Sequence, residues 1–132
     1  MERYPDNPCT LTHGFNCRMY LQGERLEVED EIWRPFENPN CNLEVCFPVR
    51  IGDIFEYPYR QVWPMLEQMV ERVGPDHLLW GTDMPFQNHF CTYRQSRNWI
   101  EQYCEFLSAE DRAAIMGGTA ARILGMENGL DD

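Results

Sequence analysis

Asp83 ends a short apolar segment, residues 77–83, and begins a loop that contains Pro85. If the segment is a buried strand, the Asp83 carboxylate lies at its carboxyl end, where α/β proteins keep their chemistry. A carboxylate there can bind a metal ion or act as a general base. The spacing alone favours a simpler interpretation, in which the side chain accepts a hydrogen bond from its own turn.

His13 has a similar position, directly after a short apolar patch at residues 10–12. A neutral imidazole suits a metal ligand or a proton shuttle, although a lone loop histidine is more often a hydrogen-bonding structural residue. His77 begins an apolar segment and is expected to be exposed and structural. His89 lies in the loop after Asp83, where it could contact a substrate or simply face solvent.

Two arginines near the start of a predicted helix, Arg94 and Arg97, could hold a substrate carboxylate. Ordinary surface charge on the helix is the slightly preferred interpretation. Several aromatic residues could line a pocket, although such residues more often belong to the core: Tyr57, Tyr59, Trp63, Trp80 and Phe86.

Hydrophobic periodicity predicts the elements that would position these side chains. Apart from the patch at 10–12, the expected elements are a helical stretch at 24–36, strands at 42–48 and 77–83, and helices at 59–73, 93–107 and 119–124. A capping box from Ser108 to Asp111 begins one more helix. Two strands separated by a helix form a βαβ unit, so the chain is predicted to be an α/β protein with a parallel sheet.

The composition excludes several classes of function. The 132 residues suit one domain, and the net charge of −11 disfavours binding to nucleic acid or to an anionic membrane. The sequence contains no apolar run of the roughly 20 residues that span a bilayer, and its start lacks the apolar core of a signal peptide. We therefore expect a cytoplasmic protein whose six cysteines are free thiols, several of them buried.

The segment Leu78-Leu79-Trp80-Gly81-Thr82-Asp83-Met84-Pro85-Phe86 resembles the last barrel strand of the amidohydrolase-related metal-dependent hydrolases. This family includes aminocarboxymuconate-semialdehyde decarboxylase and related decarboxylases. The ending at residues 118–125 is also similar to the family's closing motif, with Thr119 in place of the usual asparagine. The resemblance is specific from Tyr57 to Met126 and continues more weakly back to Leu11.

The resemblance implies a (β/α)₈ barrel with one metal ion, usually zinc, at its C-terminal mouth. Asp83 would bind the metal or handle the proton of the attacking water, and His13 would be an acid or base. The chain would form the last three strand–helix units, with a partial barrel domain at 1–126 and an acidic tail at 127–132. The family's remaining ligands, a His-x-His pair and a further histidine, have no counterpart among the three histidines here.

The leading hypothesis is therefore the C-terminal part of a metal-dependent hydrolase or non-oxidative decarboxylase. Its substrate would be a small, carboxylate-bearing molecule, contacted by Phe86, His89 and Arg94. An alternative is a non-catalytic fragment that docks on a missing N-terminal half-barrel, or that associates with itself as a homo-oligomer. A third interpretation is a small α/β domain in which the Gly-Thr-Asp run is coincidental.

Overall fold

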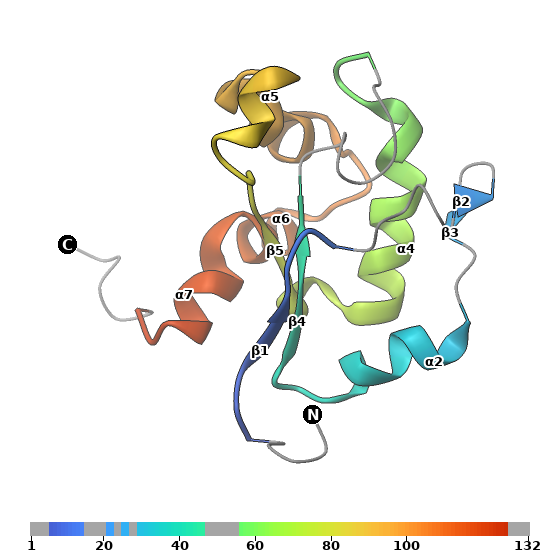
Figure 1. The fold of residues 1–132 in the computed structure, drawn as a ribbon, viewed down its shortest axis with the longest axis vertical. Coiled ribbons are helices and arrows are strands. Elements are labelled where there is room, and N and C mark those ends of the chain that lie inside the picture. Colours follow the sequence, from blue (N-terminus) through green and yellow to red (C-terminus); the bar gives the residue numbers. More distant parts are fainter. Residues whose placement is uncertain (1–5, 15–20, 23–24, 27–28, 47–55, 127–132) are drawn as a thin grey trace.

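A parallel sheet of three strands forms the centre of the molecule. The computed structural model describes residues 6–14, 21–22, 25–26, 29–46 and 56–126. The strands are β1 (Cys9–Leu11), β4 (Cys41–Val45) and β5 (Leu78–Trp80), and they lie in the order β1-β4-β5. Their carboxyl ends point toward the top of Figure 1. The predicted α/β class with a parallel sheet is confirmed.

The register of the sheet matches residues that share a face. Leu11 of β1 pairs with Leu43 of β4, which pairs in turn with Leu78 of β5. Leu43 and Leu78 are fully buried, whereas Leu11 on the outer strand is 43% exposed. The strand order follows the chain order, so the sheet grows in one direction and does not reverse as a doubly wound sheet does.

Helices and helical turns fill most of the rest of the described chain. The α-helices are α2 (Asp30–Trp33), α4 (Trp63–Val73), α5 (Tyr93–Asn98), α6 (Ala109–Ala113) and α7 (Thr119–Ile123). The 3₁₀ turns are η1 (Arg34–Glu37), η2 (Arg60–Val62), η3 (Pro75–His77) and η4 (Phe86–His89). Two segments have π-helical hydrogen bonding, η5 (Trp99–Tyr103) and η6 (Ala114–Gly118). A small antiparallel pair, β2 (Leu21–Gln22) and β3 (Arg25–Leu26), is separate from the main sheet.

The longest helix, α4, confirms the periodicity seen in the sequence. Its predicted apolar face buries Leu66, Met69 and Val73. Pro64 sits in the first turn, where its missing N–H costs no hydrogen bond, and Gly74 ends the helix with a positive φ of 89°. Figure 1 shows α4 running alongside the sheet, with α7 on the other side of the view.

A single hydrophobic cluster joins the sheet to the helices. Trp99 and Ile100 of η5 and Ile115 of η6 are essentially inaccessible, and they pack with strand residues Leu43 and Leu78. Among the aromatic residues named above, Tyr59 is buried, whereas Tyr57 and Phe86 are 36% and 39% exposed. Burial of the 17 side chains of this cluster is the main favourable contribution to folding.

Two of the predicted helices are wrong in extent. Within 24–36, Arg25 and Leu26 form strand β3, because they pair with a neighbouring segment that local periodicity does not reveal. The helix predicted for 93–107 ends at Tyr103, and the chain turns at Cys104. Leu107 is still buried, since the turn after Cys104 brings it back to the core.

The other boundaries differ by a few residues. The strand expected at 77–83 covers only Leu78–Trp80, because His77 belongs to the 3₁₀ turn η3 and the chain leaves the sheet after Trp80. The end of the strand expected at 42–48 and the tail at 127–132 lie outside the described residues. The capping box at Ser108 is confirmed: the Asp111 N–H donates to the Ser108 hydroxyl, and the Ser108 N–H donates to the Asp111 carboxylate.

The described cysteines are free thiols, as predicted: Cys9, Cys41, Cys46, Cys91 and Cys104. Burial raises the pKa of Cys41 and of Cys91, and raises that of Cys104 to about 12. These three thiols therefore stay protonated at neutral pH and are poor nucleophiles. In the part of the chain that the structure describes, none of the helices has the length and apolar character to cross a membrane.

Candidate functional site

His13 and Asp83 meet just beyond the carboxyl ends of the strands. His13 follows β1 and Asp83 follows β5, while β4 lies between these two strands. The His13 Nε2 atom is 3.4 Å from Oδ1 of Asp83. The imidazole is 52% exposed and the carboxylate 20% exposed, so the pair is open to small molecules from solvent. The two residues selected from the sequence are therefore brought together across the end of the sheet.

Both residues have an uncommon backbone conformation. His13 has a φ of 66° and Asp83 a φ of 53°, in the left-handed region that residues other than glycine rarely adopt. Such conformations persist only where the surrounding structure holds them, and they gather at functional sites. The loops after β1 and β5 thus adopt backbone conformations of higher free energy, in which these two side chains point at one another.

Glu44, near the end of β4, lies between the two loops. Its carboxylate Oε2 accepts a hydrogen bond of 2.6 Å from the backbone N–H of His13. Its side chain also passes over Gly81, the glycine that precedes Thr82 and Asp83. Glu44 was not among the site residues predicted from the sequence. The available signal was a charged residue within the otherwise apolar and amide segment Cys41–Val45.

The loop after Asp83 carries an exposed aromatic cluster, formed by Phe86, His89 and Phe90. The Phe86 N–H donates to the Asp83 carbonyl at 2.8 Å, which turns the chain into η4. The ring centroid of Phe86 lies 6.0 Å from that of His89 and 5.2 Å from that of Phe90. Phe86 and Phe90 are about 40% exposed. Two of the predicted substrate contacts, Phe86 and His89, therefore lie side by side on this loop.

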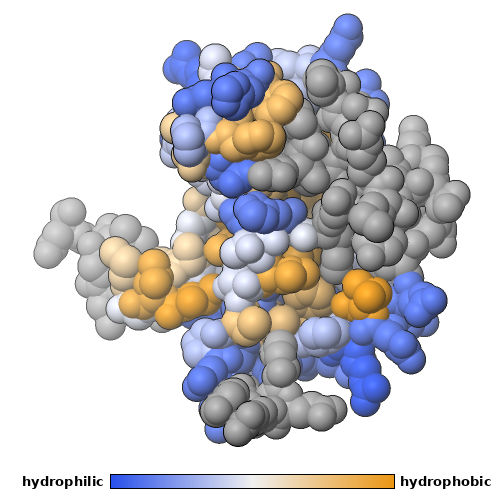
Figure 2. Space-filling view, in the orientation of Figure 1, coloured by the Kyte–Doolittle hydropathy of each residue, from blue (hydrophilic) through white to orange (hydrophobic). Residues whose placement is uncertain are grey.

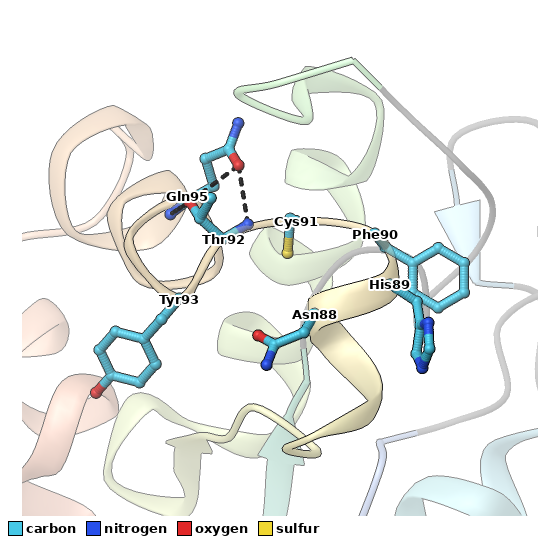
Figure 3. A pocket seen from close by; sticks show the side chains of 7 residues that line it. All are labelled: Asn88, His89, Phe90, Cys91, Thr92, Tyr93 and Gln95. Carbon is cyan, nitrogen blue, oxygen red and sulfur yellow. Dashed lines mark hydrogen bonds between the residues drawn. The ribbon is translucent and has the colours of Figure 1, made fainter.

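A shallow hollow of about 550 Å³ opens beside this loop. It is lined by Asn88, His89, Phe90, Cys91, Thr92, Tyr93 and Gln95. Figure 3 shows the His89 and Phe90 side chains on one side of the loop and Tyr93 on the other. The dashed lines mark a capping box at the start of α5, in which Thr92 and Gln95 exchange hydrogen bonds. The Thr-x-x-Gln spacing is a sequence signal for such a helix start.

The third predicted substrate contact, Arg94, lies elsewhere. It lines a second hollow, of about 330 Å³, together with Tyr93, Arg97, Asn98, Glu101 and Gln102. Arg97 in that hollow forms an ion pair with Glu101 at 2.6 Å. His89 and Arg94 thus line different hollows, and the substrate-binding roles of Phe86, His89 and Arg94 stay predictions.

The surface at the carboxyl ends of the strands is mixed in character. Figure 2 shows a band of hydrophilic side chains at mid-height, with apolar side chains both above and below it, and Phe86 and Phe90 are among the exposed apolar residues.

The sequence motif at 118–125 covers the amino ends of the strands, opposite the His13–Asp83 pair. The buried Thr119 hydroxyl contacts the carbonyls of Pro75 and Asp76 at 3.4 and 3.2 Å. The Arg122 guanidinium donates to the Asp76 carbonyl at 2.6 Å and to Oδ1 of Asn42 at 3.4 Å. These contacts satisfy backbone carbonyls just before β5, so the motif contributes to stability rather than to chemistry.

A metal ion finds too few donors among the described residues. A catalytic zinc site normally has three protein ligands. In residues 6–14, 21–22, 25–26, 29–46 and 56–126 there is no group of three or more histidine, cysteine, aspartate or glutamate side chains that could hold a metal. Asp83 and His13 by themselves therefore do not fit a catalytic metal.

Comparison with known proteins identifies the family. The family model described as "Amidohydrolase" matches residues 1–126, nearly the whole chain. The chain belongs to the amidohydrolase family. The resemblance drawn from residues 78–86 and 118–125 is thereby confirmed.

Curated relatives of this amidohydrolase include two L-fucono-1,5-lactonases. One, from Burkholderia multivorans, is 32% identical over 73 residues, which are 54% of this chain and 25% of the relative. The other, from Burkholderia ambifaria, is 34% identical over 64 residues, or 46% of this chain and 22% of the relative. The matched segments thus span about a quarter of the length of these relatives.

Solved structures share the fold of this amidohydrolase. An amidohydrolase from Burkholderia multivorans with bound zinc superposes with a TM-score of 0.75 at 21% identity, over 94% of this chain and 46% of that one. A crystal form of an amidohydrolase from the same organism with bound HEPES gives a TM-score of 0.72 with the same coverage. The chain spans a little under half of these structures.

Proposed function

We propose that residues 1–126 form the last three strand–helix units of a (β/α)₈ barrel, followed by a tail at 127–132. Three parallel strands whose spatial order follows the chain are what consecutive units of such a barrel provide. The outer strands β1 and β5 each pair on one side only within the described sheet. A closed barrel would pair both of these edges. In it, His13 and Asp83 would lie at the C-terminal mouth, where barrel enzymes carry out their chemistry.

We infer that the activity is hydrolysis of a small, polar ester-like substrate, with a sugar-acid lactone as the first candidate. The observation that carries this proposal is the 3.4 Å contact between His13 and Asp83 at the carboxyl ends of the strands. The lactonase relatives support a hydrolase and the class of substrate. Non-oxidative decarboxylation of a carboxylate-bearing substrate stays an untested prediction.

A lactone is an internal ester, so its hydrolysis adds water to the carbonyl carbon and breaks the bond from that carbon to the ring oxygen. With Nε2 of His13 turned to Asp83, Nδ1 is the nitrogen that takes a proton from the attacking water. The Asp83 carboxylate orients the ring and stabilises the imidazolium that forms. The imidazolium then gives its proton to the departing ring oxygen, which restores neutral His13.

This scheme uses a water molecule and the side chains of His13 and Asp83. A divalent metal, zinc in the family resemblance, would need ligands from outside the described residues, since these lack a three-donor group. Its place in the complete enzyme therefore stays a prediction, as does the cytoplasmic location.

The test is a lactonase assay on the purified chain with L-fucono-1,5-lactone, followed by acid release. General acid–base catalysis contributes roughly 10²- to 10⁴-fold, so Asp83→Asn and His13→Asn should each lower kcat/KM by that factor. Asp76→Asn and His77→Asn are matched controls at the opposite end of β5 and should keep the wild-type value per folded molecule. Undiminished turnover in Asp83→Asn, or a wild-type rate equal to that of buffer, would contradict the proposal.

A second candidate function is complementation of an N-terminal half-barrel. The exposed Leu11 and the unpaired side of β1 in the described sheet favour it, because an uncovered strand edge tends to associate. The chain would then become active only when mixed with the missing half. Activity that appears on mixing, at a concentration where each half alone is inactive, would support this role. A monodisperse chain that is already active would exclude it.

A further inference from the structure

The loops that carry His13 and Asp83 are joined by one side chain, that of Glu44. In the sheet, Glu44 pairs with Leu79 of β5, and Gly81 follows two residues later, just after the end of the strand. The Glu44 carboxylate therefore extends over Gly81 and reaches the loop after β1, where it accepts the His13 N–H. It thus links the backbone of His13, to which the proposed function assigns proton transfer, to the glycine two residues before Asp83, which orients the imidazole.

Two glycines in the sequence motifs make room for Glu44. A Cβ atom at Gly81 would lie 1.7 Å from Oε1 of Glu44, a distance that no pair of unbonded atoms can adopt. A Cβ atom at Gly14, whose φ is 62°, would lie 3.0 Å from the Glu44 carbonyl oxygen. The glycine of the His-Gly pair and the glycine of the Gly-Thr-Asp run thus serve the same residue on β4.

The hydrogen bond between His13 and Glu44 is of the strong kind. Its N···O distance of 2.6 Å is shorter than the usual range for a backbone N–H donor, as expected when the acceptor is charged. It acts on the backbone of a residue with a φ of 66°, a conformation that needs support. Without it, the His13 backbone would relax toward the common negative-φ regions and carry the imidazole away from Asp83.

We propose that Glu44 is a positioning residue, which lies over Gly81 and holds the His13 backbone in the left-handed conformation that faces the imidazole to Asp83. This inference rests on the proposed role of His13 and Asp83. It assigns Glu44 no contact with the substrate. It predicts that removing the carboxylate, or displacing it, disturbs the same loop in the same way.

The test compares four variants of the chain by amide hydrogen exchange, read by NMR at the His13 N–H. Glu44→Ala removes the acceptor, and a hydrogen bond to a charged group is worth about 10- to 100-fold in protection. Gly81→Ala keeps the carboxylate but displaces it, and should lower the protection by a similar factor. Gly117→Ala is the matched control, because a Cβ atom at Gly117 meets no atom within 4 Å.

Glu44→Gln provides the rescue. Its amide oxygen can still accept the His13 N–H, so protection should exceed that in Glu44→Ala. The amide proton resonance should move upfield, because the acceptor has lost its charge. Wild-type protection in Glu44→Ala or in Gly81→Ala would overturn the proposal, and so would an unchanged resonance in Glu44→Gln. Because Glu44→Gln is nearly isosteric, it keeps the test decisive if Glu44→Ala does not fold.

The lactonase assay adds a functional reading. A positioning role predicts that Glu44→Ala lowers kcat, by about 10²-fold for a displacement near 1 Å, while KM changes little. Glu44→Gln should recover part of this loss. A change in KM alone would contradict the positioning role. The exchange measurement uses no substrate, so an inactive wild-type chain would contradict the proposed function without deciding the role of Glu44.

Discussion

At the amino ends of the parallel strands, side chains of α7 donate hydrogen bonds to backbone carbonyls. Thr119 is buried there, and Arg122 closes over the residues before β5. At the carboxyl ends of the strands, His13 and Asp83 have left-handed backbone conformations and form a solvent-accessible pair. The contacts at the amino ends lower the free energy of the folded state, whereas the two left-handed backbones at the carboxyl ends raise it.

This contrast teaches where each of the two sequence motifs acts. The motif at 78–86 contains Asp83, just beyond the carboxyl end of β5, whereas the motif at 118–125 covers the amino ends of the strands. In barrel enzymes, the carboxyl ends of strands carry catalysis and the amino ends carry stability. A family motif can therefore be diagnostic of a fold without marking a reactive residue, and the end of the strands at which it lies tells the two roles apart.

The largest expected difference in stability is between Ile115 and Phe86. Ile115 is 1% exposed in the segment that leads into α7, and Ile115→Ala should lower the free energy of unfolding by about 2–5 kcal/mol. Phe86→Ala removes a 39% exposed ring from a loop at the carboxyl ends of the strands, and should cost less than about 1.5 kcal/mol. Urea unfolding measures both. Equal losses of unfolding free energy would show that the loops at the carboxyl ends of the strands contribute as much to the core as the segments at the amino ends.

A pair of threonines tests the same contrast at a smaller scale. Thr119→Val removes buried hydrogen bonds to Pro75 and Asp76, and should cost about 1–2 kcal/mol while kcat per folded molecule is kept. Thr82→Val removes only the acceptor of the Met84 N–H at 3.3 Å, next to Asp83, and should cost under about 1 kcal/mol. It should nevertheless lower kcat, because that loop carries Asp83. If Thr119→Val lowered kcat and Thr82→Val lowered only the stability, the roles assigned to the two ends of the strands would be exchanged.

At neutral pH the buried thiols have no effect on this comparison, but they give stability a pH dependence above pH 9. Burial raises the pKa of Cys104 to about 12, so folding favours the protonated thiol. Its contribution is complete below pH 9 and is lost as the pH rises toward 12, by up to about 1.4 kcal/mol per pH unit. Thermal unfolding across this range should show the decline, and Cys104→Ala should reduce the slope.

Cys91 is the thiol to compare with Cys104, because it lies on the loop beside the aromatic cluster, at the carboxyl ends of the strands. Burial also raises its pKa, but its side chain is only partly buried, whereas Cys104 is inaccessible. Cys91→Ala should therefore reduce the slope less than Cys104→Ala. If Cys91→Ala reduced the slope more than Cys104→Ala, the surroundings of Cys91 would be the more tightly packed of the two.

Several local features could be predicted because neighbouring residues decide them. The apolar face of α4 follows from side-chain spacing, and the capping box at Ser108 follows from two residues three apart. The position of Asp83 just after a strand is local in the same sense. The strand at Arg25–Leu26 was missed because it depends on pairing with another segment, which a helical period cannot exclude.

By itself, the sequence determined the α/β class, the family and the chemical types of the two central residues, since these depend on composition, period and short motifs. Only the tertiary structure decided that His13 contacts Asp83, that Glu44 lies between their loops, and that His89 and Arg94 line different hollows. The reason is physical. Contacts between residues far apart in the chain depend on strand register and backbone conformation, which no single segment specifies.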